Sequence, residues 1–68
     1  MSDHVYKSVE ITGSSTEGIQ QAIDNALAKA KQTLRHIDWF EVTELRGRVH
    51  EGKVAQYQVK MKVGFRLD

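Results

Sequence analysis

The 68-residue sequence predicts an α+β fold, a β-α-β-β unit whose three-stranded antiparallel sheet wraps around one helix. Two patterns carry this prediction. Residues 54–67 alternate between the two sides of a strand, with apolar side chains on one side and mainly polar ones on the other. Residues 19–34 instead repeat their apolar side chains at helical spacing, and shorter alternating segments before and after them supply two more strands.

The first strand is predicted over residues 4–12. Its side chains alternate, and Val9 and Ile11 lie on the apolar side. Gly13 is expected to end this strand, because glycine adopts backbone conformations that interrupt regular structure.

The helix is predicted to begin near Ser15 and to end near Leu34, which is roughly five turns. Ser14 and Glu17 have the spacing of a capping box, in which each side chain accepts a hydrogen bond from the backbone N–H of the other residue. Three residues of the apolar stripe are small enough to let a sheet approach closely: Ala22, Ala26 and Ala30.

The second strand is predicted over residues 39–49, and the parity of its apolar side chains changes midway. Phe40 and Val42 share one face, whereas the apolar residues that follow have the opposite parity. One extra residue, Thr43 or Glu44, would return all of them to a common face. We therefore expect a β-bulge at this point.

A short turn at residues 50–52 leads into the long strand, residues 54–67. The apolar face of the long strand sets the position of the core, and its polar face carries Gln58 and Arg66. Trp39 should share that polar face, since its neighbour in the sequence faces the helix. One helix covers only one face of a sheet, so this outer face meets either water or other subunits.

Composition excludes several function classes. The net charge is +1, which provides no field to attract nucleic acid. There is no cysteine, and the three histidines lie far apart without ligand spacing, so we expect no metal site. No apolar run reaches membrane-spanning length and no secretory signal precedes the first strand, so we expect a cytoplasmic, single-domain protein over residues 1–68. A domain this small is marginally stable alone, and we expect it to self-associate.

Trp39 and Gln58 are the candidate ligand-binding residues. An indole stacks on a flat heteroaromatic ring, and a side-chain amide offers a donor and an acceptor to a ring edge. A hairpin turn centred near Glu51 would place Gln58 opposite Glu44, about four residues or ~13 Å from Trp39. We therefore expect the two side chains to contact one ligand from different subunits. The alternative is that Trp39 anchors a subunit interface and binds nothing.

Several short motifs are spread over essentially the whole chain. They are Tyr6-Lys7, Val9-Glu10, Gly13-Ser14-Ser15, Asp38-Trp39-Phe40-Glu41-Val42, Arg46-Gly47, Tyr57-Gln58-Val59 and Val63-Gly64-Phe65-Arg66-Leu67. In their order, spacing and total length they resemble the dodecins, small flavin-binding proteins that assemble as hollow dodecamers. The resemblance is to the bacterial branch of that family.

The resemblance implies a homododecameric hollow sphere that binds flavins as stacked pairs between subunits. It implies that Trp39 stacks on the flavin ring and that Gln58 hydrogen-bonds the pyrimidine edge. FMN is the flavin it favours, with riboflavin or an FAD-related flavin as alternatives. It also implies coenzyme A as a second ligand, for which the sequence suggests no residues.

Arg46 and Arg66 are the candidates for binding the FMN phosphate, because a guanidinium group matches the geometry of a phosphate. The alternative is that these arginines form ion pairs with Glu41 or Glu44 of a neighbouring subunit.

A ligand pair held between tryptophans leaves little room for a substrate, and an indole beside an excited flavin favours quenching. We therefore expect flavin storage, buffering and photoprotection, and no enzyme activity. The alternatives are an oligomeric protein-interaction scaffold without flavin function, and a nucleic-acid-binding surface that includes Lys60, Lys62 and Arg66. The near-zero net charge argues against the latter.

Overall fold

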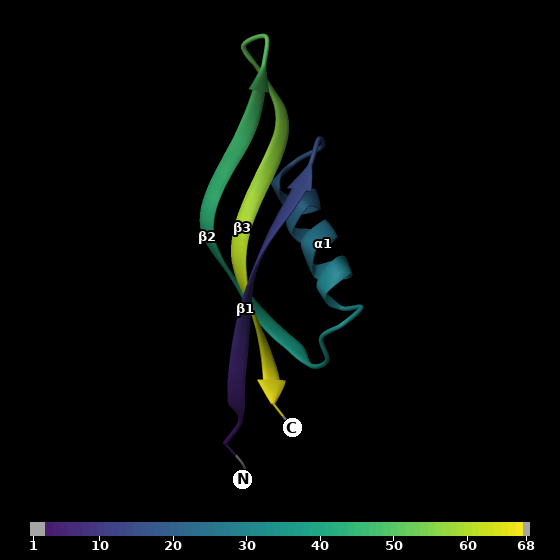
Figure 1. Cartoon of the computed structure of the whole chain (residues 1–68), viewed down its shortest axis with the longest axis vertical. Helices are drawn as coiled ribbons and strands as arrows, with labels where there is room; N and C mark the ends of the chain where they lie inside the picture. The colour runs from purple at the N-terminus through teal and green to yellow at the C-terminus, as the bar shows by residue number, and fades with distance from the viewer. Residues whose placement is uncertain (1–2, 68) are drawn as a thin grey trace.

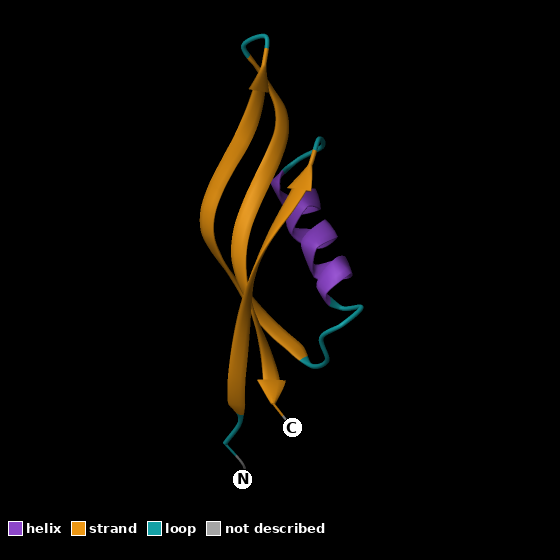
Figure 2. Ribbon diagram, in the orientation of Figure 1, coloured by secondary structure: helices purple, strands orange, loops and turns teal. Residues whose placement is uncertain are grey.

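The computed structural model describes residues 3–67, which form β1 (Val5–Ser15), α1 (Ile19–Ala30), β2 (Ile37–His50) and β3 (Lys53–Leu67). The three strands form one antiparallel sheet, as the sequence predicts, and their order in it is β1-β3-β2 (Figures 1 and 2). The molecule is elongated, with extents of 55 × 20 × 14 Å. The β2–β3 hairpin extends beyond the helix at one end (Figure 1).

The core lies between α1 and the middle of β3. Its buried apolar residues are Ala22, Ala26, Ala30, Val59, Met61 and Val63. The predicted alanine stripe and the predicted apolar parity of the long strand are therefore confirmed. Within residues 3–67, the helix packs against β1 and β3 but not along β2, of which Ile37 contacts the core. The sheet curves past the helix, and one of its three strands stays uncovered.

Gly13 lies inside β1, paired with Val59, so the expectation that it ends the strand is wrong. A Cβ atom at this position would lie 2.7 Å from the Cβ of Ala26 and would also collide with the carbonyl oxygen of Ala22. The glycine therefore allows the helix to approach the strand closely, in keeping with the small residues on the helix side.

The helix is shorter than predicted at its N-terminal end. β1 continues to Ser15, and Ser14 pairs with Gln58 of β3, so the serine that was predicted to cap the helix belongs to the sheet. The helix has no side-chain cap. The Oγ of Ser15 instead accepts a hydrogen bond of 2.9 Å from the backbone N–H of Glu17 in the connecting turn.

The helix also ends earlier than predicted, at Ala30. The backbone N–H groups of Gln32 and Thr33 donate to carbonyl groups three residues back, at 3.2 and 3.1 Å. Bonds of this spacing tighten the last turn and stop the helical ladder. The chain then enters β2 through His36, which has a positive φ of 60°.

The predicted bulge in β2 is present at Thr43, where the register shifts between Val42 and Glu44. Two further register shifts follow Ile37 and Arg48, and the sequence patterns did not predict them. Such shifts increase the local twist and bend a strand. They accompany the curvature of the hairpin in Figure 1.

The turn between β2 and β3 is a two-residue hairpin loop. His50 pairs with Lys53, and the intervening Glu51 and Gly52 have φ values of 51° and 76°. Two consecutive positive φ values are those of a type I′ turn, whose twist matches the twist of paired strands. The predicted use of Gly52 for a positive φ is confirmed.

Three apolar side chains of β2 lie on the helix side of the sheet without cover: Phe40, Val42 and Leu45. Each stands opposite a buried residue of β3, which confirms the predicted parity. They are nevertheless 45%, 45% and 54% exposed, because the helix does not reach across to β2. A single chain thus leaves a row of large apolar side chains in water, a feature typical of surfaces that meet another protein.

Candidate functional site

The outer face is the side of the sheet that points away from α1. Cross-strand pairing places four rows of residues on it: Ser8-Gly64-Trp39, Glu10-Lys62-Glu41, Thr12-Lys60-Glu44 and Ser14-Gln58-Arg46. Arg66 follows Gly64 on the same face, so all four predicted site residues lie there. The predicted orientation of Trp39, opposite to that of Phe40, is confirmed.

Trp39 lies across the sheet on the backbone of β3. Its strand partner is Gly64, and a Cβ atom built on Gly64 would stand 2.5 Å from indole atom Cδ2 and closer still to Cε2 and Cζ2. One face of the indole is thus covered by bare backbone. The residue is still 39% exposed, so part of the indole stays accessible on the outer face.

Arg66 lies next to this tryptophan, two residues along β3 from Gly64. Its Nη2 is 3.3 Å from Nδ1 of His36, and its backbone N–H donates to the carbonyl of His36 at 3.0 Å. Because a guanidinium only donates, Nδ1 of His36 is the acceptor in this contact. Arg66 is therefore held in place by a contact that does not neutralise its charge.

Tyr6 stands opposite Arg66 on the neighbouring strand β1. The pKa of Tyr6 is raised above its ordinary value, mainly because its hydroxyl hydrogen-bonds the side chain of Asp38 and also through partial burial and the negative charge of Asp38. The positive charge of Arg66 acts in the opposite direction. Aromatic, acidic and basic groups therefore meet beside Trp39.

Gln58 lies in a polar network farther along the sheet. It stands opposite Arg46, and its Oε1 accepts a hydrogen bond from Arg46 Nη1 at 3.5 Å. Its Nε2 donates to Oε1 of Gln56 at 3.0 Å. Arg46 Nη2 forms an ion pair with Glu44 of the same chain, and both of these side chains are about half exposed.

The expected register, with Gln58 opposite Glu44, is wrong. Glu44 pairs with Lys60, two residues away, because the hairpin turn and the shift after Arg48 together move the pairing of the two strands. The alternative considered for Arg46 was an ion pair with Glu41 or Glu44 of a neighbouring subunit; its ion pair with Glu44 is instead made within one chain.

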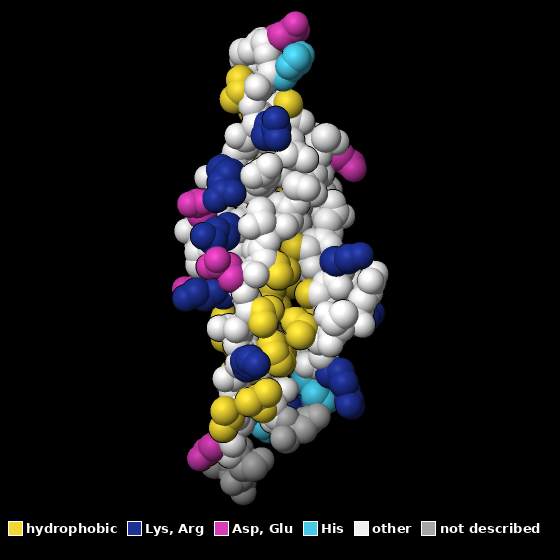
Figure 3. Space-filling view, viewed as in Figure 1, with side chains coloured by type: hydrophobic (Ala, Val, Ile, Leu, Met, Phe, Trp, Pro, Cys, Tyr) yellow, Lys and Arg dark blue, Asp and Glu magenta, His cyan; other side chains and the backbone are white. Residues whose placement is uncertain are grey.

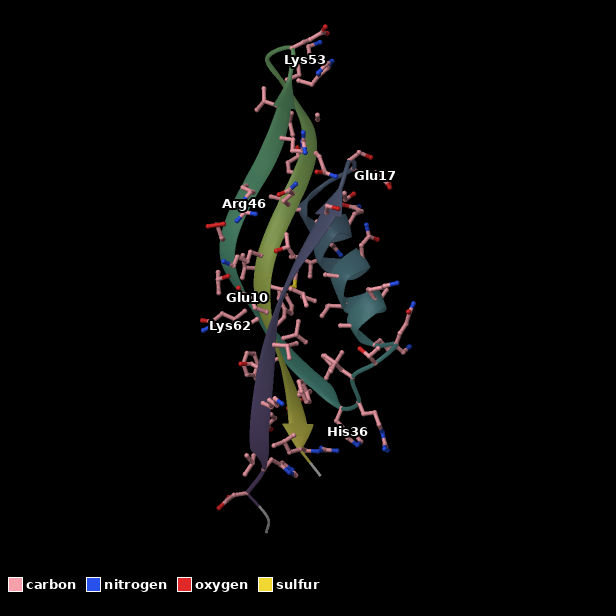
Figure 4. All side chains as sticks on the ribbon, viewed as in Figure 1. Glu10, Glu17, His36, Arg46, Lys53 and Lys62 are labelled. Atoms are coloured by element: carbon pink, nitrogen blue, oxygen red, sulfur yellow. The ribbon has the colours of Figure 1, made fainter. Side chains whose placement is uncertain are left out.

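The tryptophan and the glutamine are farther apart than predicted. Gly64, which lies beneath Trp39, is six residues from Gln58 along β3, or about 20 Å at the rise of an extended strand. Rows of charged residues, among them Glu10 and Lys62, lie between them (Figure 4). The expectation that one chain cannot hold one ring with both side chains therefore becomes stronger.

Each chain carries two separate groups of residues on one face. We call Trp39, Gly64 and Arg66 the Trp39 half-site. We call Gln58, Arg46, Glu44 and Gln56 the Gln58 half-site. In Figure 4 the labels of His36, which contacts Arg66, and of Arg46 mark the separation between the two half-sites along the sheet.

Two apolar hollows lie on the helix side of the sheet. The larger, about 520 Å³, lies between β1 and the C-terminal half of α1, and its apolar lining includes Val9, Ile11, Ala26, Ala30 and Leu34. Figure 3 shows hydrophobic side chains gathered between the strands and the helix. The smaller, about 380 Å³, is lined by Leu27, Lys31, Leu34, His36 and Ile37. Neither hollow contains any of the four predicted site residues.

Sequence reasoning missed the part played by Gly64. The signal that could have found it is a glycine inside a long alternating strand, where glycine is unfavourable and often marks a close approach.

Within residues 3–67 the structure has no group of three or more His, Cys, Asp or Glu residues that could hold a metal ion. The described helix is too short to cross a membrane.

Comparisons with known proteins agree on one family. The family model for Dodecin matches residues 5–68. The dodecin of Thermus thermophilus is 58% identical over 64 residues, which are 94% of this chain and 93% of the relative. The structure of the dodecin from Streptomyces davaonensis is 54% identical, with a TM-score of 0.93 over 98% of both chains. A calcium dodecin from Mycobacterium tuberculosis, described with a calcium-binding site, is 28% identical, with a TM-score of 0.81 over 94% of this chain and 91% of its own.

Proposed function

The chain belongs to the dodecin family, and on that premise we propose that it binds flavins as stacked pairs between the subunits of a homododecamer. The favoured ligand is FMN or a related flavin. The protein would store and buffer flavin and shield it from light. It would act as a binding protein and not as an enzyme.

The observation that carries this proposal is the setting of Trp39. Its indole lies over a strand backbone on an otherwise polar face, and 39% of the residue is exposed in the single chain. A tryptophan that served the core would point toward α1, as Val63 and Met61 do. An indole covered on one side and accessible on the other is suited to stacking on one flat ring.

The Gln58 half-site would orient the flavin by hydrogen bonds to its pyrimidine edge. Its amide has one donor side and one acceptor side, which its contacts with Gln56 and Arg46 hold in a fixed orientation. A pyrimidine edge offers the complementary pattern of acceptors and donors. On binding, the flavin edge would replace the long hydrogen bond from Arg46, leaving that guanidinium available to a phosphate.

Assembly would complete the site. Since about 20 Å separates Gln58 from the backbone beneath Trp39, a ring that contacts both must lie between chains. The exposed apolar row of β2 gives the chain a reason to assemble, because each side chain buried there contributes roughly 1 kcal/mol or more. We expect flavin binding and self-association to strengthen each other for this reason.

Stacking also supports the proposed role. A flavin enzyme needs free space beside the reactive ring edge. Tryptophans on both sides of a flavin pair would close that space and place an oxidisable indole against the excited ring. The expected consequence is strong quenching of flavin fluorescence, which suits storage and photoprotection.

The test is a fluorescence titration of FMN into the flavin-free protein, with particle size measured by light scattering on the same sample. We expect strong quenching on a large, compact particle. An assembled particle that leaves FMN bright would contradict the proposal. It would favour the alternative, an oligomeric scaffold whose outer face meets another protein.

A further inference from the structure

Gly64 lies in the middle of the central strand and carries the indole of Trp39 directly on its backbone. Glycine in a strand interior is unfavourable, because it loses more conformational freedom on folding than other residues. Left-handed backbone geometry does not explain its presence, since the only described glycine with a positive φ is Gly52. The space occupied by the indole does explain it.

We propose that Gly64 is the positioning residue for flavin stacking: the absence of a side chain at this position sets the depth and tilt of the Trp39 indole. The inference rests on the proposed flavin function, which it extends from the stacking residue to the surface beneath it. Gly64 itself does not contact the ligand. It acts through Trp39, which lies between it and the flavin.

The expected displacement follows from contact distances. A Cβ at Gly64 would stand 2.5 Å or less from three indole atoms, Cδ2, Cε2 and Cζ2. Carbon atoms in contact need about 3.5–4.0 Å, so the ring must rise or tilt by at least about 1 Å. The strand cannot move away easily, because Val63 is fully buried against the core.

A rise of this size matters for a ligand pair held between two tryptophans. If both indoles rise by about 1 Å, the gap narrows by about 2 Å, a large part of the thickness of one ring. The smallest side chain would therefore exclude part of the ligand pair without touching it. This sensitivity is specific to residue 64, because its neighbours Val63 and Phe65 point to the other side of the sheet.

The first experiment compares Gly64→Ala with Gly18→Ala, a control in which the new methyl group meets only the flexible side chain of Gln21. Trp39 is the single tryptophan of the chain, so its emission reports on this indole alone. In the flavin-free protein we expect Gly64→Ala to shift the emission to longer wavelength and to increase quenching by acrylamide. We also expect FMN affinity to fall at least tenfold, with Gly18→Ala like the wild type in all three.

The second experiment separates positioning from a general need for glycine in the strand. Thermal unfolding is measured for Gly64→Ala, Trp39→Ala and the double variant. If the indole is the obstacle, Gly64→Ala lowers the melting temperature in the wild type and has little effect once Trp39 is alanine. An equal loss in both backgrounds would overturn the proposal, as would unchanged emission and FMN affinity in Gly64→Ala.

Failure of the proposed function gives a different result. If the wild-type protein does not quench FMN, flavin stacking is wrong for this chain. The emission and the unfolding cycle still decide whether Gly64 positions the indole.

Discussion

The two half-sites on the outer face differ in how they hold their residues. At the Trp39 half-site an apolar ring lies on bare backbone, and its neighbour Arg66 contacts the imidazole of His36. At the Gln58 half-site four polar side chains are linked by hydrogen bonds and an ion pair. The Trp39 half-site offers a surface for stacking and a positive charge, and a ligand would have to replace few existing contacts there. The Gln58 half-site offers directional hydrogen bonds, but it must give up existing contacts to bind a ligand.

Binding energy and selectivity would therefore arise at different half-sites. Stacking on an exposed indole gains energy without breaking any polar contact. Hydrogen bonds to Gln58 replace existing ones, so their net contribution is about 1 kcal/mol. We therefore expect the Trp39 half-site to set affinity and the Gln58 half-site to set ligand choice.

Removal of the indole should have the largest effect. We expect Trp39→Ala to lower FMN affinity by about 100-fold, since stacking on an aromatic side chain contributes about 1–3 kcal/mol and each ligand pair meets two tryptophans. Trp39→Phe, which keeps a smaller ring, should retain part of the affinity. The measurement is the FMN fluorescence titration. Tight binding and strong quenching in Trp39→Ala would show that the half-sites are not divided in this way.

Mixed assemblies test whether the half-sites act between chains. We expect Trp39→Ala and Gln58→Ala chains, co-expressed with different tags and purified as mixed particles, to recover sites that neither variant has alone. With random mixing, about a quarter of the Trp39–Gln58 pairings between neighbours are intact. Particles of each variant alone are the controls. If mixed particles bind FMN no better than the average of the two, the two residues do not form a shared site.

Substitutions at Gln58 should alter the selectivity among flat ligands more than the affinity for FMN. We expect Gln58→Ala to weaken FMN binding about tenfold, the effect of losing about 1.4 kcal/mol of hydrogen bonding. Gln58→Glu keeps the size but removes the donor, so it should also lose selectivity for FMN over a flat ring without a pyrimidine edge. Competition titrations with such a ring measure this. Loss of affinity without any loss of selectivity would assign Gln58 a purely structural part.

Replacing the arginines of the two half-sites should lower FMN affinity by a smaller factor than replacing Gln58. Arg46 would have to leave Glu44, whereas Arg66 keeps its positive charge beside His36. We expect Arg66→Ala to weaken FMN binding several-fold, Arg46→Ala less, and neither to affect riboflavin, which lacks the phosphate. The FMN effect should shrink at high salt. Equal losses for FMN and riboflavin would contradict a phosphate-binding part.

The sequence predicted which face each residue occupies better than where along the sheet it lies. Alternation with period two fixed the sides of Trp39, Phe40 and Gln58, because one face of the sheet is buried. The distance between Trp39 and Gln58 depends on the turn and on register shifts that leave no periodic signal. The site was therefore predicted on the correct face but with an incorrect separation.

The helix ends and the parts played by Gly13 and Gly64 were not predicted, for a related reason. Ser14 and Ser15 have the residue types of a helix cap, but pairing with β3 outweighs that local preference. Gly13 was expected to end a strand, and Gly64 was given no part. Each glycine instead makes room for a part of the chain that is distant in sequence. Gly64 makes room for the side chain of Trp39, and Gly13 makes room for α1.

The smallest expected effect concerns Tyr6, at the margin of the Trp39 half-site. Its hydrogen bond with Asp38 raises its pKa, so the folded protein holds the phenolic proton more tightly than the unfolded chain. The resulting stability is present below pH 10 and is lost as the pH rises through the raised pKa. We expect the melting temperature of Tyr6→Phe to lie slightly below that of the wild type at pH 8 and to converge with it at strongly alkaline pH.

Melting curves of both proteins between pH 8 and about pH 12 measure this difference. Tyr57→Phe is the matched control, because it changes the other tyrosine of the chain, which lies on the helix side of the sheet. A difference between Tyr6→Phe and the wild type that stays constant over the range would mean that the Tyr6 hydroxyl contributes no stability through its proton. In that case the contact between Tyr6 and Asp38 would add no stability beside Trp39 through its proton, and the contrast with the extended network of the Gln58 half-site would become sharper.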